Sequence, residues 1–178
     1  MKKTVFLGFI NKYFPPFWQN LSKDLSRIIP FSYTPLPIEI EMKSLYSSDR
    51  NQYHSSQILS EVIDRMPDSG EKIVGITNVD IFIPILTFLF GEAQLFGKGA
   101  LVSTHRLQNE FYGLPGDNKL LYERILKEVL HEFGHTLGLI HCKNFSCVMT
   151  SSSYVEGIDL KNAQFCRQCK ARLKSELK

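Results

Sequence analysis

The first forty residues alternate between strand-like and helical patterns of apolar positions. Residues 1–10 are mostly apolar after two lysines and predict a first β-strand. A helix is predicted next by apolar residues at three- and four-residue spacing, which are Trp18, Leu21, Leu25, Ile28 and Ile29. Residues 31–40 alternate loosely and contain two prolines, which lack the N–H that a β-ladder needs. We therefore predict that this segment forms a strand near the edge of a sheet.

The middle of the chain continues this alternation. A second helix is predicted by an apolar stripe that ends before a Pro- and Gly-containing cluster and consists of Ile58, Leu59, Val62, Ile63 and Met66. Residues 73–77 are apolar without polar alternation, which predicts a strand that is buried on both faces. Residues 100–107 alternate more regularly and predict a further strand, which we place at an edge of the sheet. Strands that alternate with helices favour an α/β (mixed α+β) fold with a mixed sheet.

A long helix is expected next, and it carries part of a metal-binding motif. Its N-cap is Asp117 or Asn118, and its apolar stripe consists of Tyr122, Ile125, Leu126, Val129, Leu130, Phe133 and Leu137. His131 and His135 lie about 40° apart around the helix axis and one turn apart along it, so both imidazoles can bind one ion. Glu132 projects to the neighbouring side, where it can reach a water on that ion without binding the ion itself. This is the arrangement expected of the HExxH motif.

The residues that follow this helix indicate a third ligand. Gly138 follows His135 by three residues, and His141 follows Gly138 by three. A glycine can adopt the left-handed conformation that ends a helix and turns the chain, which brings His141 back toward the first two histidines. Three neutral imidazoles leave a tetrahedral zinc with one open position, which is the design of a catalytic site. A histidine-rich surface helix is the alternative, but three of the five histidines lie here at this spacing.

All four cysteines follow the histidines and form two close pairs, Cys142 with Cys147 and Cys166 with Cys169. Two close pairs that are separated by a loop are typical of a four-cysteine zinc site. Such a site has no open position, so the second zinc is expected to be structural. Two disulfides are the alternative. A reducing compartment argues against them, and a closed zinc site beside Cys142 would also help to orient the adjacent His141.

Charge and hydropathy narrow the class of partner. The formal net charge of +3 is small and spread along the chain, which indicates neither a nucleic-acid-binding surface nor a polybasic membrane patch. The apolar runs at residues 1–10 and 81–90 are too short to span a bilayer, and the first has no small-residue cleavage site. We therefore predict a cytoplasmic monomer without a membrane or nucleic-acid partner, which acts on peptides or small molecules.

The sequence HEFGHTLGLIH at residues 131–141 resembles the long zinc-binding motif of metzincin metallopeptidases. The further residues that carry a resemblance to the archaemetzincin family are Cys142, Cys147, Met149, Cys166 and Cys169. Residues 77–82 and 90–93 are also similar to that family. The resemblance therefore covers most of the chain.

This resemblance implies a metzincin-like fold with a substrate cleft between two lobes. Residues 1–138 would form the N-terminal lobe with its mixed sheet, two packing helices and the active-site helix. Residues 139–178 would form a small, zinc-bound C-terminal lobe within the same metallopeptidase domain. Met149 would form a hydrophobic floor beneath the zinc-binding histidines. In such enzymes the substrate pairs with an exposed edge strand, for which we predict residues 99–107.

We therefore predict a zinc metallopeptidase with one catalytic and one structural zinc and with Glu132 as the general base. Tyr154 lies near Met149 and is a candidate for stabilising the oxyanion. Two alternatives stay open. One is a zinc hydrolase that acts on a non-peptide amide, and the other is a zinc-organised module that binds peptides without cutting them. Glu132 disfavours the second, because a binding module needs no general base beside an open metal position.

Overall fold

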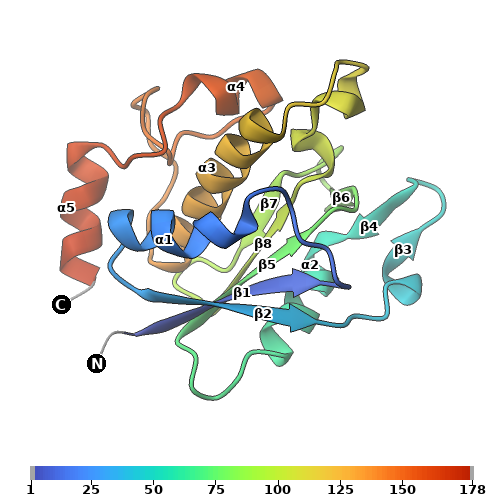
Figure 1. The fold of residues 1–178 in the computed structure, drawn as a ribbon, viewed down its shortest axis with the longest axis horizontal. Coiled ribbons are helices and arrows are strands. Elements are labelled where there is room, and N and C mark those ends of the chain that lie inside the picture. Colours follow the sequence, from blue (N-terminus) through green and yellow to red (C-terminus); the bar gives the residue numbers. More distant parts are fainter. Residues whose placement is uncertain (1–2, 177–178) are drawn as a thin grey trace.

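The structure is a computed structural model that describes residues 3–176, and a five-stranded sheet forms its centre (Figure 1). The strand order is β2-β1-β5-β8-β7. The strands are β1 (Thr4–Ile10), β2 (Ser32–Ile38), β5 (Lys72–Thr77), β7 (Gly91–Ala93) and β8 (Gly99–Ser103). The first four strands in this order are parallel to one another, and β7 is antiparallel to β8. The predicted mixed sheet is therefore confirmed.

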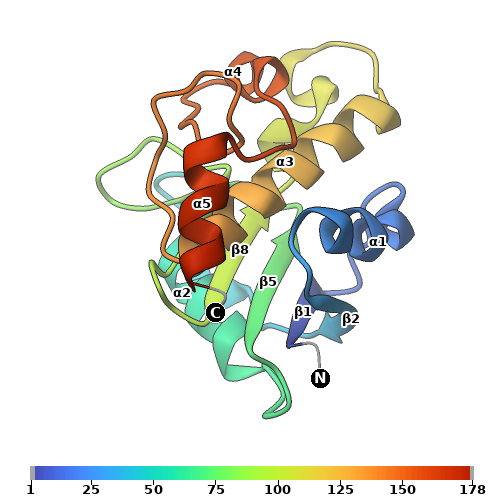
Figure 2. The ribbon, with the colours of Figure 1, turned by 90° about the vertical axis from the view of Figure 1, so that its left-hand side faces the viewer.

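Helices cover both faces of this sheet (Figure 2). α1 (Trp18–Ile28) and α3 (Asn118–Thr136) pack on one face, and α2 (Ser55–Asp64) packs on the other. Because side chains alternate along a strand, β1 contributes to both cores. Its Val5, Leu7 and Phe9 face α1 and α3, while Phe6 and Ile10 face α2. The sheet and the two earlier helices thereby form a rigid base on which α3 is fixed.

The edge strands differ in part from those that the sequence predicts. β2 is an edge strand and contains both prolines, as expected. The placement of residues 99–107 at an exposed edge is wrong. β8 is buried at every position between β5 and β7, it ends at Ser103, and residues 105–107 form a 3-10 helix. The reason is that β7, whose three residues are too short to show a periodic pattern, adds to the sheet outside β8.

A small second sheet lies beside the main one and was not predicted. It contains β3 (Tyr46–Ser47), β4 (Gln52–His54) and β6 (Ile81–Phe82) in the order β3-β4-β6, after a 3-10 helix at Lys43–Leu45. A further 3-10 helix at Asn109–Tyr112 precedes α3. These elements span two to four residues each, which is too short for hydrophobic periodicity to reveal them.

α3 begins where the sequence predicts. The Asp117 side chain accepts hydrogen bonds from the backbone N–H groups of Lys119 and Leu120, at 3.0 and 2.9 Å. After α3 the chain forms two further helices, α4 (Val155–Leu160) and α5 (Arg167–Glu176). The sequence also predicts a terminal helix over residues 165–178 with Cys166 and Cys169 in its first turn; this helix corresponds to α5, and residues 177–178 lie outside the described residues. No helix within residues 3–176 is long and apolar enough to cross a membrane.

Candidate active site

The end of α3 and the turn that follows it bring the three predicted histidines together. His131 and His135 lie in the last two turns of α3. Gly138 has a φ of 83°, the left-handed conformation predicted for it, and a side chain there would overlap the ring of Phe96. One ring nitrogen each from His131, His135 and His141 lies within 4.8 Å of the other two. The glycine turn therefore places the third histidine beside the first two.

Backbone carbonyls orient the two helical imidazoles. Nδ1 of His131 donates to the carbonyl of Val148 at 2.8 Å, and Nδ1 of His135 donates to the carbonyl of Leu139 at 2.7 Å. Because a carbonyl can only accept, each Nδ1 carries the proton and each Nε2 keeps its lone pair. The two Nε2 atoms are 3.2 Å apart, and two ligands of a tetrahedral zinc lie about 3.3 Å apart. Two lone pairs at this distance repel each other unless a cation lies between them, so the site fits a zinc ion.

Burial shifts the pKa values of the groups beside this site. The pKa of His131 lies well below its usual value, first because the ring is buried and then because of the positive charge of Lys161. This favours the neutral imidazole that binds metals. The pKa of Glu132 is raised well above its usual value, first by burial and then by the nearby negative charge of Glu128. Glu132 therefore holds a proton more readily than an ordinary carboxylate, which suits proton transfer.

The position of the Glu132 carboxylate depends on a glycine in the edge strand. A Cβ at Gly91 would lie 2.6 Å from Cγ and 2.8 Å from Oε1 of Glu132, and 2.7 Å from the carbonyl oxygen of Leu101. No side chain fits there without movement of Glu132 or of the backbone. β7 and α3 thus approach each other closely at the carboxylate.

The four cysteines also come together, on the C-terminal side of the histidines. Their sulfur atoms all lie within 4.8 Å of one another, and all four cysteines are free thiols. Sγ of Cys142 and Sγ of Cys166 are 3.7 Å apart, and two sulfurs on a tetrahedral zinc lie about 3.8 Å apart. Backbone N–H groups of Asn144 and Cys166 donate to Sγ of Cys142 and Cys147 at 3.4 and 3.3 Å. The arrangement fits a four-thiolate zinc site and does not show the alternative of two disulfides.

A cleft of about 670 Å³ opens in front of the histidines. Its lining includes residues 86–90, which we call the cleft wall, and residues Ser151–Tyr154. The ionisable side chains that line it with them are Glu128, His131, Glu132, His135, His141 and Lys161. The cleft is large enough for several residues of an extended chain.

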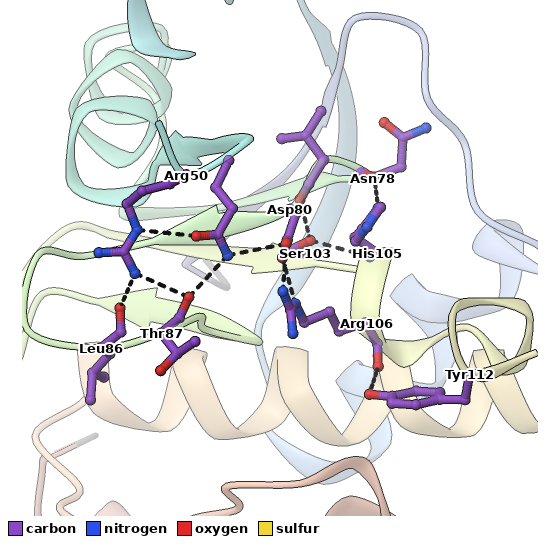
Figure 3. A network of polar contacts seen from close by, with 11 residues as sticks. Arg50, Asn78, Asp80, Leu86, Thr87, Ser103, His105, Arg106 and Tyr112 are labelled. Atoms are coloured by element: carbon purple, nitrogen blue, oxygen red, sulfur yellow. Dashed lines mark hydrogen bonds and ion pairs between the residues drawn. The ribbon is translucent and has the colours of Figure 1, made fainter. Parts of the chain in front are cut away.

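A polar network holds the cleft wall in place (Figure 3). Arg106 donates two hydrogen bonds to the carboxylate of Asp80, both at 2.7 Å, and its guanidinium lies 4.2 Å from the ring centroid of Phe88. Arg50 donates to the carbonyl of Leu86 at 2.7 Å. Charge-assisted and bidentate hydrogen bonds of this kind fix geometry more firmly than neutral ones. The cleft wall is therefore held by side chains from outside this segment.

Comparison with known proteins identifies the family. A family model described as peptidase family M54 matches residues 26–175. The archaemetzincin of Methanocaldococcus jannaschii is 46% identical over 128 residues, which are 72% of this chain and 69% of that protein. The archaemetzincin of Thermococcus kodakarensis is 34% identical over 168 residues, 89% of each chain. The chain belongs to peptidase family M54, the archaemetzincins.

Solved structures of archaemetzincins agree with the fold. The crystal structure of archaemetzincin from Methanopyrus kandleri has a TM-score of 0.86 and 30% sequence identity, and the match covers 99% of this chain and 96% of that one. A zinc-dependent peptidase from Methanocorpusculum labreanum has a TM-score of 0.84 at 30% identity, covering 95% and 99%. The predicted family, the metzincin-like fold and the class of zinc metallopeptidase are confirmed.

Met149, the methionine that the archaemetzincin resemblance singles out, lies between the histidines and the cysteines. It is fully buried, and a Cβ at Gly134 would lie 2.5 Å from its sulfur. Its carbonyl accepts a hydrogen bond from the backbone N–H of Cys142 at 3.0 Å. The preceding carbonyl, that of Val148, is the acceptor for His131. One short segment therefore touches the active-site helix, one histidine and one cysteine.

Some residues of the archaemetzincin cleft carry no signal in the sequence. The predicted oxyanion candidate Tyr154 does line the cleft and is 73% exposed. The cleft wall, Glu128 and Lys161 were not singled out. Glu128 looks like one more polar residue of α3, and Lys161 like a lysine of a loop, until the fold places them in contact.

Proposed function

We propose that this archaemetzincin hydrolyses peptide bonds with one zinc ion held by His131, His135 and His141 and with Glu132 as the general base. The observation that carries the proposal is the pair of Nε2 atoms, 3.2 Å apart and each oriented by a backbone carbonyl, beside a buried carboxylate in an open cleft. A second, structural zinc is held by Cys142, Cys147, Cys166 and Cys169.

The proposed organisation follows the two sites. Residues 1–178 form one metallopeptidase domain, in which residues 1–138 are the N-terminal lobe and residues 139–178 the C-terminal lobe. Met149 forms the floor beneath the histidines, which its burial against Gly134 supports. The strand that pairs with the substrate is β7, since it is the exposed antiparallel edge beside the cleft.

In the proposed mechanism Glu132 transfers the proton, and two backbone carbonyls keep the histidines oriented. When bound, zinc supplies a water of lowered pKa and a positive charge near the carbonyl oxygen of the substrate. Glu132 takes a proton from the attacking water at its carboxylate and later delivers it to the leaving amine. Its buried position favours holding the proton between these two steps. The carbonyls of Val148 and Leu139 keep His131 and His135 oriented throughout.

A mixed peptide library tests this proposal. We expect purified zinc-loaded protein to cut at defined bonds, which mass spectrometry of the products would locate. Simple amides without a peptide backbone serve as the comparison. Turnover of those amides with no peptide cut would show a non-peptide hydrolase instead. Peptide binding without any cleavage would show a binding module.

Replacing Gly91 by alanine is expected to displace the Glu132 carboxylate, because the added methyl group would overlap it. We expect kcat to fall by about 100-fold, the usual effect of a displacement of about 1 Å at a catalytic group, while the zinc content stays unchanged. Steady-state kinetics and metal analysis check this. Gly8→Ala is the matched control in β1, because its Cβ would meet only side-chain carbons, the nearest at 3.1 Å. Unchanged kcat in Gly91→Ala would contradict the close approach.

A further inference from the structure

A buried ion pair lies in the cleft beside the proposed zinc site and takes no part in the mechanism described so far. Nζ of Lys161 donates to Oε1 of Glu128 at 2.8 Å and to the carbonyl of Thr150 at 3.3 Å. The two charged side chains are only 1% and 4% exposed, yet both residues line the cleft. Glu128 precedes His131 by three residues on α3, so both lie on the same face of the helix.

This pair is not explained by stability alone. Removing an ammonium and a carboxylate from water costs more than a single ion pair usually returns, and apolar residues of similar size pack as well or better. Lys161 does join the segment after α4 to α3. Lys127 already joins α4 itself to α3, because its Nζ donates to the carbonyls of Ile158 and Asp159 at 3.0 and 3.2 Å. A second link between these parts of the chain is not needed for stability, so we look for another role for the buried pair of Lys161 and Glu128.

The pair has hydrogen-bonding capacity left over. An ammonium has three donors, and the contacts of Lys161 within residues 3–176 account for two of them. Oε2 of Glu128 accepts no hydrogen bond from any residue that the structure describes. The hydroxyl of Ser152, which also lines the cleft, is buried and without a partner in the same part of the chain. A ligand in the cleft can therefore pair with Oε2 of Glu128, with the free donor of Lys161 and with the hydroxyl of Ser152, of which only the hydroxyl is buried without a partner among the described residues.

We propose that Lys161 and Glu128 determine specificity by binding a carboxamide side chain, that of glutamine or asparagine, next to the scissile bond. The carboxamide oxygen accepts from Lys161, and its N–H donates to Glu128. A neutral side chain with both a donor and an acceptor matches a net neutral pair that offers one of each. An acidic side chain would be repelled by Glu128 and a basic one by Lys161, and an apolar one would leave the free donor of Lys161 and Oε2 of Glu128 without a partner.

This inference rests on the proposed function, since it assigns a substrate side chain to the same cleft. Its test uses a peptide that the zinc-loaded enzyme cuts, with Gln, Glu, Met or Lys placed in turn on either side of the scissile bond. Glu is isosteric with Gln and differs in charge, and Met has a similar length without hydrogen bonds. We expect kcat/KM for Gln to exceed that for Glu and Met by about tenfold or more at one of the two positions.

The variant Glu128→Gln should change this preference in a defined way. Its amide oxygen can keep the hydrogen bond to Lys161, which turns the N–H₂ group toward the cleft and leaves the positive charge of Lys161 uncompensated. Both changes favour an acidic substrate side chain. We expect the ratio of kcat/KM for Gln to that for Glu to fall by about tenfold or more relative to the wild type. Lys127→Met is the matched control, because it removes the tether outside the cleft and should leave the ratio unchanged.

The outcomes separate this inference from the proposed function. Peptides that are cut equally well with Met or Gln at both positions would overturn the carboxamide pocket and leave the peptidase intact. If no peptide is cut at all, the proposed function itself fails. The wild-type series needs no variant, so the test holds even if Glu128→Gln does not fold. A change of ratio in Lys127→Met as large as in Glu128→Gln would show that the pair acts only as a tether.

Discussion

Glu132→Gln is expected to keep its zinc and to lose peptidase activity by about 10²- to 10⁴-fold, the contribution of a positioned general base. The amide has nearly the shape of the carboxylate, so it fits against Gly91 in the same way. It cannot take a proton from water. The loss should therefore fall on kcat, because the contacts that bind the substrate stay in place.

Metal analysis and steady-state kinetics on the same preparation check this expectation. Glu123→Gln is the matched control, since Glu123 is an exposed glutamate of α3 and lies two turns before the first histidine. It should retain full activity. A Glu132→Gln enzyme that turns over near the wild-type rate would remove Glu132 from the mechanism. A variant that loses zinc together with activity would show that Glu132 supports the metal site instead.

The sequence predicts the cluster of the three histidines and Glu132 because its signals are local. His131, Glu132 and His135 lie within five residues on a helix with a strong apolar stripe and an N-cap at Asp117, so their relative geometry follows from the helix alone. Gly138 extends the prediction by one more turn, because its positive φ determines where the chain goes next. Each of the two cysteine pairs is likewise a short-range feature, and only the contact between the two pairs depends on the fold.

Features that arise from tertiary contact could not be predicted in this way. β7 has three residues, and its place at the edge depends on pairing with β8. Burial of β8 on both faces follows from the helices α2 and α3, so its alternating pattern was misleading. Lys161 and Glu128 are 33 residues apart. The bidentate contact between Arg106 and Asp80 that steadies the cleft wall spans 26 residues. None of these pairs leaves a periodic trace in the sequence.

Removing one thiolate should disturb catalysis as well as stability, because the two proposed zinc sites share a backbone segment. Cys142 directly follows His141, and its N–H donates to the carbonyl of Met149, next to the carbonyl that orients His131. Cys169→Ser alters a buried sulfur of the four-cysteine group. We expect it to lose one zinc per chain and to be destabilised by about 4 kcal/mol or more, as for other losses of a structural metal.

The coupling between the two proposed zinc sites is measured on the Cys169→Ser protein that remains folded. At a temperature low enough to keep Cys169→Ser folded, we expect kcat per folded molecule to fall by about tenfold or more, since a small displacement of a ligand is enough for such a loss.

Leu173→Ala is the comparison, because it removes a buried side chain of α5 without altering a thiolate. That variant should lose about 2–5 kcal/mol of stability but keep both zinc ions and its kcat. Thermal unfolding, metal content and kinetics on the two variants distinguish the cases. Equal kcat in both would mean that the four-cysteine site stabilises the C-terminal segment without orienting His141. A loss of kcat that is confined to Cys169→Ser would mean that the four-cysteine site orients His141 in the catalytic site.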